Sequence, residues 1–130
     1  MRYSGNKYGN VKTVTSDGVK HDSIKEANRW CELKLLERAG KITDLQRQVP
    51  FELIPAQYEE YERYSKSGKQ LKSGKRCVEK SVVYVADFVY RENGIKIVED
   101  SKSPATKKKE SYIIKRKLLL WVFGIKLRET

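Results

Sequence analysis

Residues 81–102, SVVYVADFVYRENGIKIVEDSK, carry the strongest structural signal in the chain. Two runs rich in Val, Ile, Tyr and Phe flank Asn93-Gly94, a dipeptide that readily adopts the positive φ angles of a two-residue hairpin turn. The stretch therefore predicts two antiparallel strands, at 81–90 and 95–102, in the centre of a sheet.

The same turn sets the pairing of the two strands. A turn with Asn93-Gly94 at its centre gives the cross-strand pairs Glu92–Ile95, Tyr90–Ile97 and Asp87–Asp100. Opposed side chains share one face of a sheet, where two like charges are destabilising. Lys102 lies two residues after Asp100, on the same face. The sequence therefore predicts that two carboxylates and one ammonium group converge.

A divalent cation would make this pair of carboxylates tolerable. Strand alternation surrounds the charges with apolar residues, namely Val83, Val85, Val89 and Val98. Carboxylate oxygens are hard ligands that suit Mg²⁺ or Mn²⁺, whereas zinc prefers His or Cys. The alternative is a surface salt bridge of Lys102 at an ordinary strand end.

A basic helix is predicted downstream, from about residue 107 to 123, with Gly124 at its end. Its expected inner stripe is Ile114, Leu118, Trp121 and Val122. Lys108, Tyr112 and Lys115 recur on the opposite side, where they could contact phosphates. The alternative is a solvated lysine face. A short strand at 125–128 closes the chain.

Upstream, Ser23 is expected to start a helix that ends near Gly40, with Ile24, Ala27, Cys31 and Leu35 on the buried side. Ser23 and Glu26 form an S-x-x-E capping box, so the Glu26 carboxylate has a structural role available to it.

The remaining segments complete the fold prediction. Residues 1–10 form a flexible basic arm, and Asp17-Gly18 joins a small hairpin within 11–22 that includes His21. Residues 45–58 contain Pro50 and Pro55 and so predict an edge strand or a bulge. A mobile basic loop is expected at about 62–77. Residues 11–130 then form one α+β domain with a layered core.

Composition points to a polyanionic partner. Lys and Arg outnumber Asp and Glu by 28 to 17, which gives a formal net charge of +11. Nucleic acid is the leading candidate and a membrane surface is the rival. The alternative is that the basic balance only keeps the chain soluble. The chain shows no signal or membrane-spanning segment, so a cytoplasmic protein is expected. Cys31 and Cys77 suggest reduced thiols, and Trp30 and Trp121 are expected in or near the core.

The spacing of Asp87, Asp100 and Lys102 resembles the signature of the PD-(D/E)XK nuclease superfamily. The segments DGVKHDSIKEANRWCELKLLERAGKI, YVADF, IVEDSK and YIIKRKLL are similar to those of short phage and prophage proteins assigned to that superfamily. The similarity spans most of residues 10–130. Ala86 stands where the family signature has Pro, and Asp100 stands where many members have Glu.

The resemblance implies a restriction-endonuclease-like αβββαβ core and Mg²⁺- or Mn²⁺-dependent hydrolysis of DNA. It implies that Asp87, Asp100, the Ser101 carbonyl and Glu26 hold the metal and that Lys102 orients the nucleophile. Gln48 joins Lys108, Tyr112 and Lys115 as a candidate phosphate contact.

Holliday-junction resolvases resemble this arrangement and work as dimers, so branched or double-stranded DNA and a homodimer are expected, with no nucleotide cofactor. The alternatives are a non-catalytic DNA-binding or phage-assembly module and a nuclease that acts on RNA.

Overall fold

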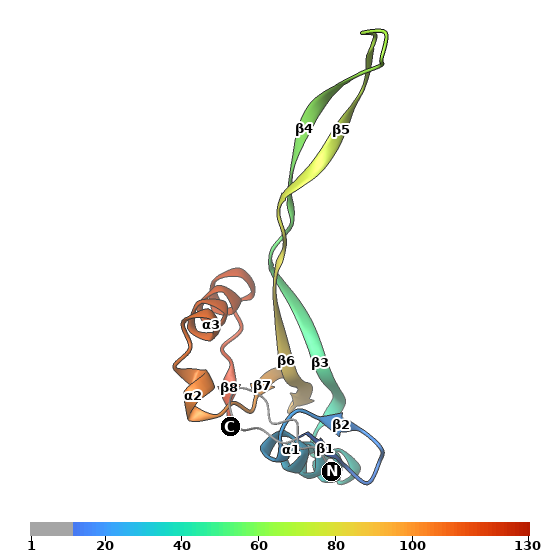
Figure 1. Ribbon diagram of the computed structural model, residues 1–130. Coiled ribbons are helices and arrows are strands. Elements are labelled where there is room, and N and C mark those ends of the chain that lie inside the picture. The colour runs from blue at the N-terminus through green and yellow to red at the C-terminus, as the bar shows by residue number, and fades with distance from the viewer. Residues whose placement is uncertain (1–11) are drawn as a thin grey trace.

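The structure is a computed structural model that describes residues 12–130. The predicted arm at residues 1–10 lies outside the described residues. The chain forms an α+β fold around a mixed four-stranded sheet with strand order β3-β6-β7-β8. These strands are β3 (Thr43–Ile54), β6 (Val82–Glu92), β7 (Ile95–Asp100) and β8 (Arg128–Glu129). A long two-stranded ribbon projects from the body of the molecule (Figure 1).

The N-terminal part forms the predicted hairpin and helix. Strands β1 (Thr13–Val14) and β2 (Lys20–His21) pair antiparallel, and Gly18 has a φ of +84° in the turn. Helix α1 (Ile24–Arg38) starts after Ser23, whose hydroxyl accepts a hydrogen bond from the Glu26 amide. It ends before Gly40, which has a φ of +74°. The boundaries of this helix are confirmed.

The central hairpin has the predicted register. Glu92 pairs with Ile95 and Tyr90 with Ile97, while Asn93 and Gly94 both have positive φ angles. The ladder ends at Phe88–Glu99, and Asp87 and Asp100 occupy the next positions along the same register. Strand β3 pairs only with β6 and is the predicted edge strand, and β8 lies parallel to β7 at the other edge.

Two apolar clusters lie on opposite faces of the sheet. Val89 and Val98 are cross-strand partners and pack with Tyr112 and Leu119. The next pair, Tyr90–Ile97, packs with residues of α1, including Trp30 and Leu33. Successive pairs of a sheet point to opposite faces. Helix α3 (Glu110–Phe123) therefore covers one face and α1 covers the other.

The alternation of side chains in β6 changes at Asp87. Tyr84 and Ala86 belong to the cluster below α3, whereas Phe88 and Tyr90 belong to the cluster below α1. Strict alternation would place all four on one face. Opposite this point in β3, Gln48 has a φ of +53°, an uncommon value for a residue with a side chain. Asp87 therefore sits at an irregularity of β6, opposite a residue with an uncommon backbone conformation, and such conformations cluster at functional sites.

The C-terminal helix is shorter than predicted, and its buried side differs from the prediction. A separate turn, α2 (Pro104–Lys107), precedes α3, which ends at Gly124 in the left-handed conformation. Tyr112 and Leu119 are the buried residues of α3. Trp121 is 86% exposed, and Ile114 and Val122 are also exposed. The predicted stripe of Ile114, Leu118, Trp121 and Val122 is therefore wrong except for the partly buried Leu118.

The predicted face of α1 is wrong except for Ala27, which is buried as predicted. The buried residues are Glu26, Ala27, Trp30 and Leu33, whereas Ile24, Leu35 and Cys31 are exposed. Trp30 lies in the core as expected.

The segment predicted as an irregular loop at about 62–77 is paired strand. Strands β4 (Gln57–Tyr64) and β5 (Gln70–Glu79) form the projecting ribbon, with a tight turn that includes Gly68 at a φ of +85° (Figure 1). The Gly, Ser and Lys residues of this stretch suggested a loop, but cross-strand pairing holds them in a hairpin. Among the described residues, no helix is long and apolar enough to cross a membrane.

Candidate active site

The structure brings Asp87, Asp100 and Lys102 together at the end of the β6–β7 pair. The Lys102 ammonium nitrogen lies 3.6 Å from Asp87 Oδ1 and 3.3 Å from Asp100 Oδ1. Both aspartates are buried and the lysine side chain is partly exposed. The predicted convergence of two carboxylates and one ammonium group is therefore confirmed.

Specific hydrogen bonds hold the two aspartates in place. The Ser101 amide donates to Asp87 Oδ2 at 2.9 Å, and the Tyr84 hydroxyl donates to Asp100 Oδ2. Burial raises the pKa of Asp87 although Lys102 opposes this effect. Burial also raises the pKa of Asp100, to about 6. The hydrogen bonds and positive charge around each carboxylate therefore do not fully offset the cost of burying its negative charge.

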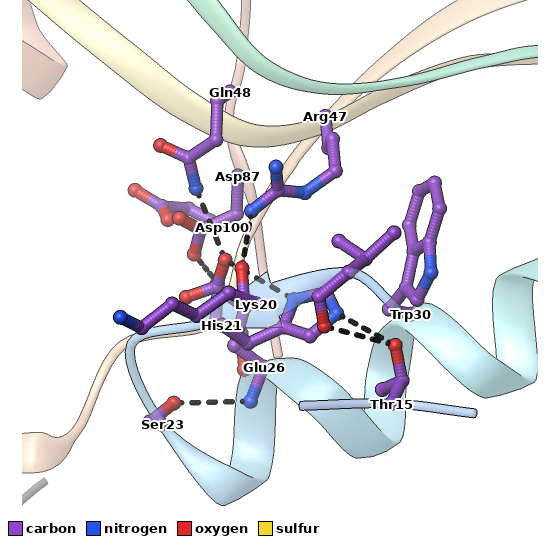
Figure 2. A network of polar contacts seen from close by, with 12 residues as sticks. Thr15, Lys20, His21, Ser23, Glu26, Trp30, Arg47, Gln48, Asp87 and Asp100 are labelled. Carbon is purple, nitrogen blue, oxygen red and sulfur yellow. Dashed lines mark hydrogen bonds and ion pairs between the residues drawn. The ribbon is translucent and has the colours of Figure 1, made fainter. Parts of the chain in front are cut away.

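Glu26 enters the same site from α1. Figure 2 shows Gln48 from β3 and His21 from β2 gathered around its carboxylate. Gln48 Nε2 donates to Glu26 Oε1 at 3.0 Å, and His21 Nδ1 lies 3.7 Å from the same oxygen. Burial raises the pKa of Glu26 to about 7, and the Asp87 carboxylate adds to this shift. Glu26 and Asp87 are thus close enough to repel each other.

The capping box forms only in part. The Ser23 hydroxyl caps the Glu26 amide, but the Glu26 side chain points to Gln48 instead of to the Ser23 amide. The sequence left open whether the Glu26 carboxylate caps the helix. In the structure it does not. The side chain is free of the cap and belongs to the acidic site.

His21 and Arg47 support the site although the sequence did not single them out for this. His21 is buried, and burial followed by the nearby Arg47 guanidinium lowers its pKa. Arg47 Nη2 donates to the Lys20 carbonyl at 2.8 Å and so ties β3 to the N-terminal hairpin (Figure 2). These contacts join segments far apart in sequence, so local periodicity gives no signal for them.

Glu99 is a further buried acid, which the sequence did not single out. It lies next to Asp100 in β7 but points to the opposite face, where Arg29 Nε and Nη2 donate to its two oxygens at 2.7 and 2.8 Å. The Tyr90 hydroxyl also donates to it, at 2.8 Å. Its charge is fully paired, so this group stabilises the contact between α1 and β7.

Of the residues predicted to contact phosphates, only one lies at the site. Gln48 lies in it, through Glu26. Tyr112 is buried below α3 in the apolar core, so its prediction as a phosphate contact is wrong. Lys108 is exposed at the end of α2 and Lys115 is half-buried on α3. In residues 12–130, neither forms an ion pair with the acidic residues of the site.

The donor set of the site suits a hard divalent cation. Asp87, Asp100 and Glu26 offer carboxylate oxygens, the ligands that Mg²⁺ and Mn²⁺ prefer. Asp100 Oδ1 is buried and accepts no hydrogen bond of good geometry, although the Lys102 ammonium is near it. Within the described part of the chain, no three His, Cys, Asp or Glu side chains are already spaced to hold a metal. An ion would therefore enter only with a shift of Lys102 or Glu26.

Comparisons with known proteins place the chain in one family. No curated protein and no solved structure matches it. A family model with the description "Protein of unknown function (DUF1064)" matches residues 5–129. This match includes every residue of the site and nearly the whole sequence. The chain therefore belongs to the DUF1064 family.

Proposed function

We propose that this protein is a metal-dependent nuclease that hydrolyses phosphodiester bonds in DNA. The observation that carries the proposal is the contact of one ammonium group, Lys102, with the buried carboxylates of Asp87 and Asp100. Buried acids with raised pKa values and a specific charged neighbour are typical of functional sites. The position of Asp87 at an irregularity of β6, opposite the uncommon backbone conformation of Gln48, supports the same conclusion.

The order of elements supports a restriction-endonuclease-like fold within the PD-(D/E)XK superfamily. With the β4–β5 ribbon, the N-terminal hairpin and the α2 turn set aside, the chain runs α1, β3, β6, β7, α3, β8. This is the αβββαβ order that the resemblance predicts. The antiparallel β3-β6-β7 unit with a parallel β8 at its edge provides the matching mixed sheet.

The proposed chemistry assigns a role to each group. Asp87, Asp100, the Ser101 carbonyl and Glu26 would hold Mg²⁺ or Mn²⁺. The bound metal would supply charge stabilisation for the phosphate and a lower pKa for a water molecule. Lys102 reaches both aspartates, so its ammonium group can orient the attacking water and offset the negative charge that develops on the phosphate.

The proposed substrate is double-stranded or branched DNA, and the proposed active form is a homodimer. The C-terminal turn of α3 exposes Leu120, Trp121, Val122 and Phe123. An exposed apolar patch of this kind marks an association surface. In a symmetric dimer the same patch would meet itself across a two-fold axis.

A second candidate is a non-catalytic DNA-binding module on the same fold. Lys102 already pairs with both aspartates, and no ready metal-binding group exists among residues 12–130. In this case the acidic cluster would be structural, and the net charge of +11 would serve phosphate binding alone.

A cleavage assay separates the two functions. Plasmid, linear duplex, four-way-junction DNA and matched RNA are incubated with the protein and Mg²⁺ or Mn²⁺. We expect the wild type to cut DNA, and Asp87→Asn to cut at least about 100-fold more slowly, the scale of losing a group that stabilises a transition state. Lys102→Ala should bind DNA but fail to cut, while Lys126→Ala, at an exposed site, should cut normally.

Absence of metal-dependent cleavage by the wild type, or full activity of Asp87→Asn, would refute the nuclease function. Cleavage confined to RNA would leave the site intact but overturn the proposed substrate.

A further inference from the structure

The β4–β5 ribbon is an exposed two-stranded sheet without a cover. It stands away from the body of the protein, and within residues 12–130 neither strand pairs with a third (Figure 1). Between residues 57 and 79, every residue is exposed except Ser65 and Gly74, which are partly buried. The eight residues of β4 extend about 26 Å at roughly 3.3 Å per residue. An uncovered hairpin of this length offers both of its faces to a partner.

The tip of the ribbon, residues 63–71, carries only positive charge, whereas Glu59 and Glu60 of β4 lie opposite Arg76 and Lys75 of β5. Residues 63–78 contain no Asp or Glu and hold six basic residues, which are Arg63, Lys66, Lys69, Lys72, Lys75 and Arg76. Arg76 pairs with Glu59 on the neighbouring strand. The four lysines form no ion pair with any residue of the described chain, 12–130. Unpaired cations along a narrow exposed element match a row of phosphates.

Side-chain packing stiffens the middle of the ribbon. The ring of Tyr61 lies over Gly74, where a Cβ atom would collide with it. The Arg76 guanidinium lies 5.3 Å from the centre of the same ring. An aromatic ring over a cross-strand glycine is a known device for stabilising exposed sheet edges. The ribbon can therefore keep its shape before a partner binds, which lowers the cost of binding.

The shape of the ribbon favours duplex DNA over RNA. The major groove of B-DNA is about 12 Å wide and admits a two-stranded β-ribbon. The major groove of A-form RNA is deep and narrow and does not admit side chains in this way. Lysines contact phosphates and carry little sequence information. The contact should therefore be independent of sequence.

We propose that the β4–β5 ribbon holds duplex DNA by lying in the major groove with its lysines on the flanking phosphates. The ribbon continues into β3 and β6, which carry Gln48 and Asp87 at the acidic site. DNA held by the ribbon is thereby tethered to the elements that bear the catalytic groups. This inference deepens the proposed nuclease function by naming the surface that binds its substrate.

A binding experiment without cleavage tests the ribbon. The full chain with Asp87→Asn is titrated with a fluorescent DNA duplex in EDTA, and anisotropy is recorded between about 50 and 200 mM salt. In that background, the variant Lys66→Gln, Lys69→Gln, Lys72→Gln is compared with a charge-matched control, Lys41→Gln, Lys117→Gln, Lys126→Gln. All six lysines are exposed, so circular dichroism should show both variants folded.

We expect the ribbon variant to bind at least tenfold more weakly. The negative slope of log K against log salt should become shallower by about 2 to 3, because each lost phosphate contact changes it by about 0.9. The control should stay within about threefold of its parent. Equal affinity of the two variants would overturn the proposal. So would equally tight binding of duplex RNA, or a ribbon variant that changes only self-association in sedimentation. If the wild type bound DNA through the ribbon but did not cleave it, the nuclease function would be refuted and the ribbon proposal would stand.

Discussion

The Glu26 carboxylate should make the stability of the metal-free protein depend on pH. Its pKa in the folded protein is about 7, against 4.5 as its ordinary value, chiefly because it is buried. The folded state therefore holds a proton that the unfolded state has lost between these values. We expect the free energy of unfolding, measured by urea denaturation in EDTA, to fall as the pH rises from 4.5 to 7.

Glu26→Gln is the matched variant for this prediction, since it keeps the shape and removes the titration. It should flatten the pH dependence over that interval, although Asp100, with a pKa of about 6, leaves a smaller slope. An unchanged profile in Glu26→Gln would contradict the burial of this carboxylate beside Asp87.

The Arg29–Glu99 pair should contribute to stability and not to catalysis. Glu99 is fully buried and accepts two hydrogen bonds from Arg29. Arg29→Leu leaves a buried carboxylate without its cation, which costs about 3–5 kcal/mol. Arg29→Leu combined with Glu99→Leu should recover most of this loss in thermal unfolding. If the double variant were as unstable as Arg29→Leu, lost packing and not an unpaired buried charge would explain the destabilisation.

Local register made the convergence of the candidate catalytic residues predictable, whereas the long-range contacts of the site could not be predicted. Asp87, Asp100 and Lys102 lie on one hairpin whose turn sets their pairing, so their convergence follows from the sequence. The contacts of Glu26 with Gln48 and His21 depend on how α1, β3 and β2 meet in space. The spacing of these residues along the chain does not predict their contacts in the folded protein.

At the scale of the element, α3 shows why hydrophobic periodicity misled the prediction. Residues 112–123 carry apolar side chains on every side of the helix. The sheet covers only the side that carries Tyr112 and Leu119. The pattern could identify a helix and its Gly124 end, but it could not tell which apolar side would be buried.

Two neighbouring leucines of α3 test this assignment. Leu119 is fully buried, so Leu119→Ala should lower the free energy of unfolding by about 2–5 kcal/mol through the cavity it leaves. Leu120 is 53% exposed, and Leu120→Ala should cost far less. Chemical denaturation of both variants makes the comparison. Similar losses would contradict the orientation of α3.

At the scale of the whole molecule, the exposed apolar end of α3 should mediate dimerisation. Trp121 is 86% exposed, more than any other large apolar residue of the described chain. We expect sedimentation analysis to show a dimer for the wild type and a monomer for Trp121→Ser, with unchanged circular dichroism. A monomeric wild type at micromolar concentration would contradict the dimer, and the single-chain site would then have to act alone.

The most direct test of the account is the anomalous diffraction of crystals soaked in Mn²⁺, because the central claim is that the buried carboxylates form a cation site. We predict a peak within coordination distance of both Asp87 and Asp100, with the Lys102 ammonium displaced from its present contacts, and no such peak in Asp100→Asn. A soaked wild-type crystal with Lys102 still bridging the two aspartates and no manganese at the site would contradict the account.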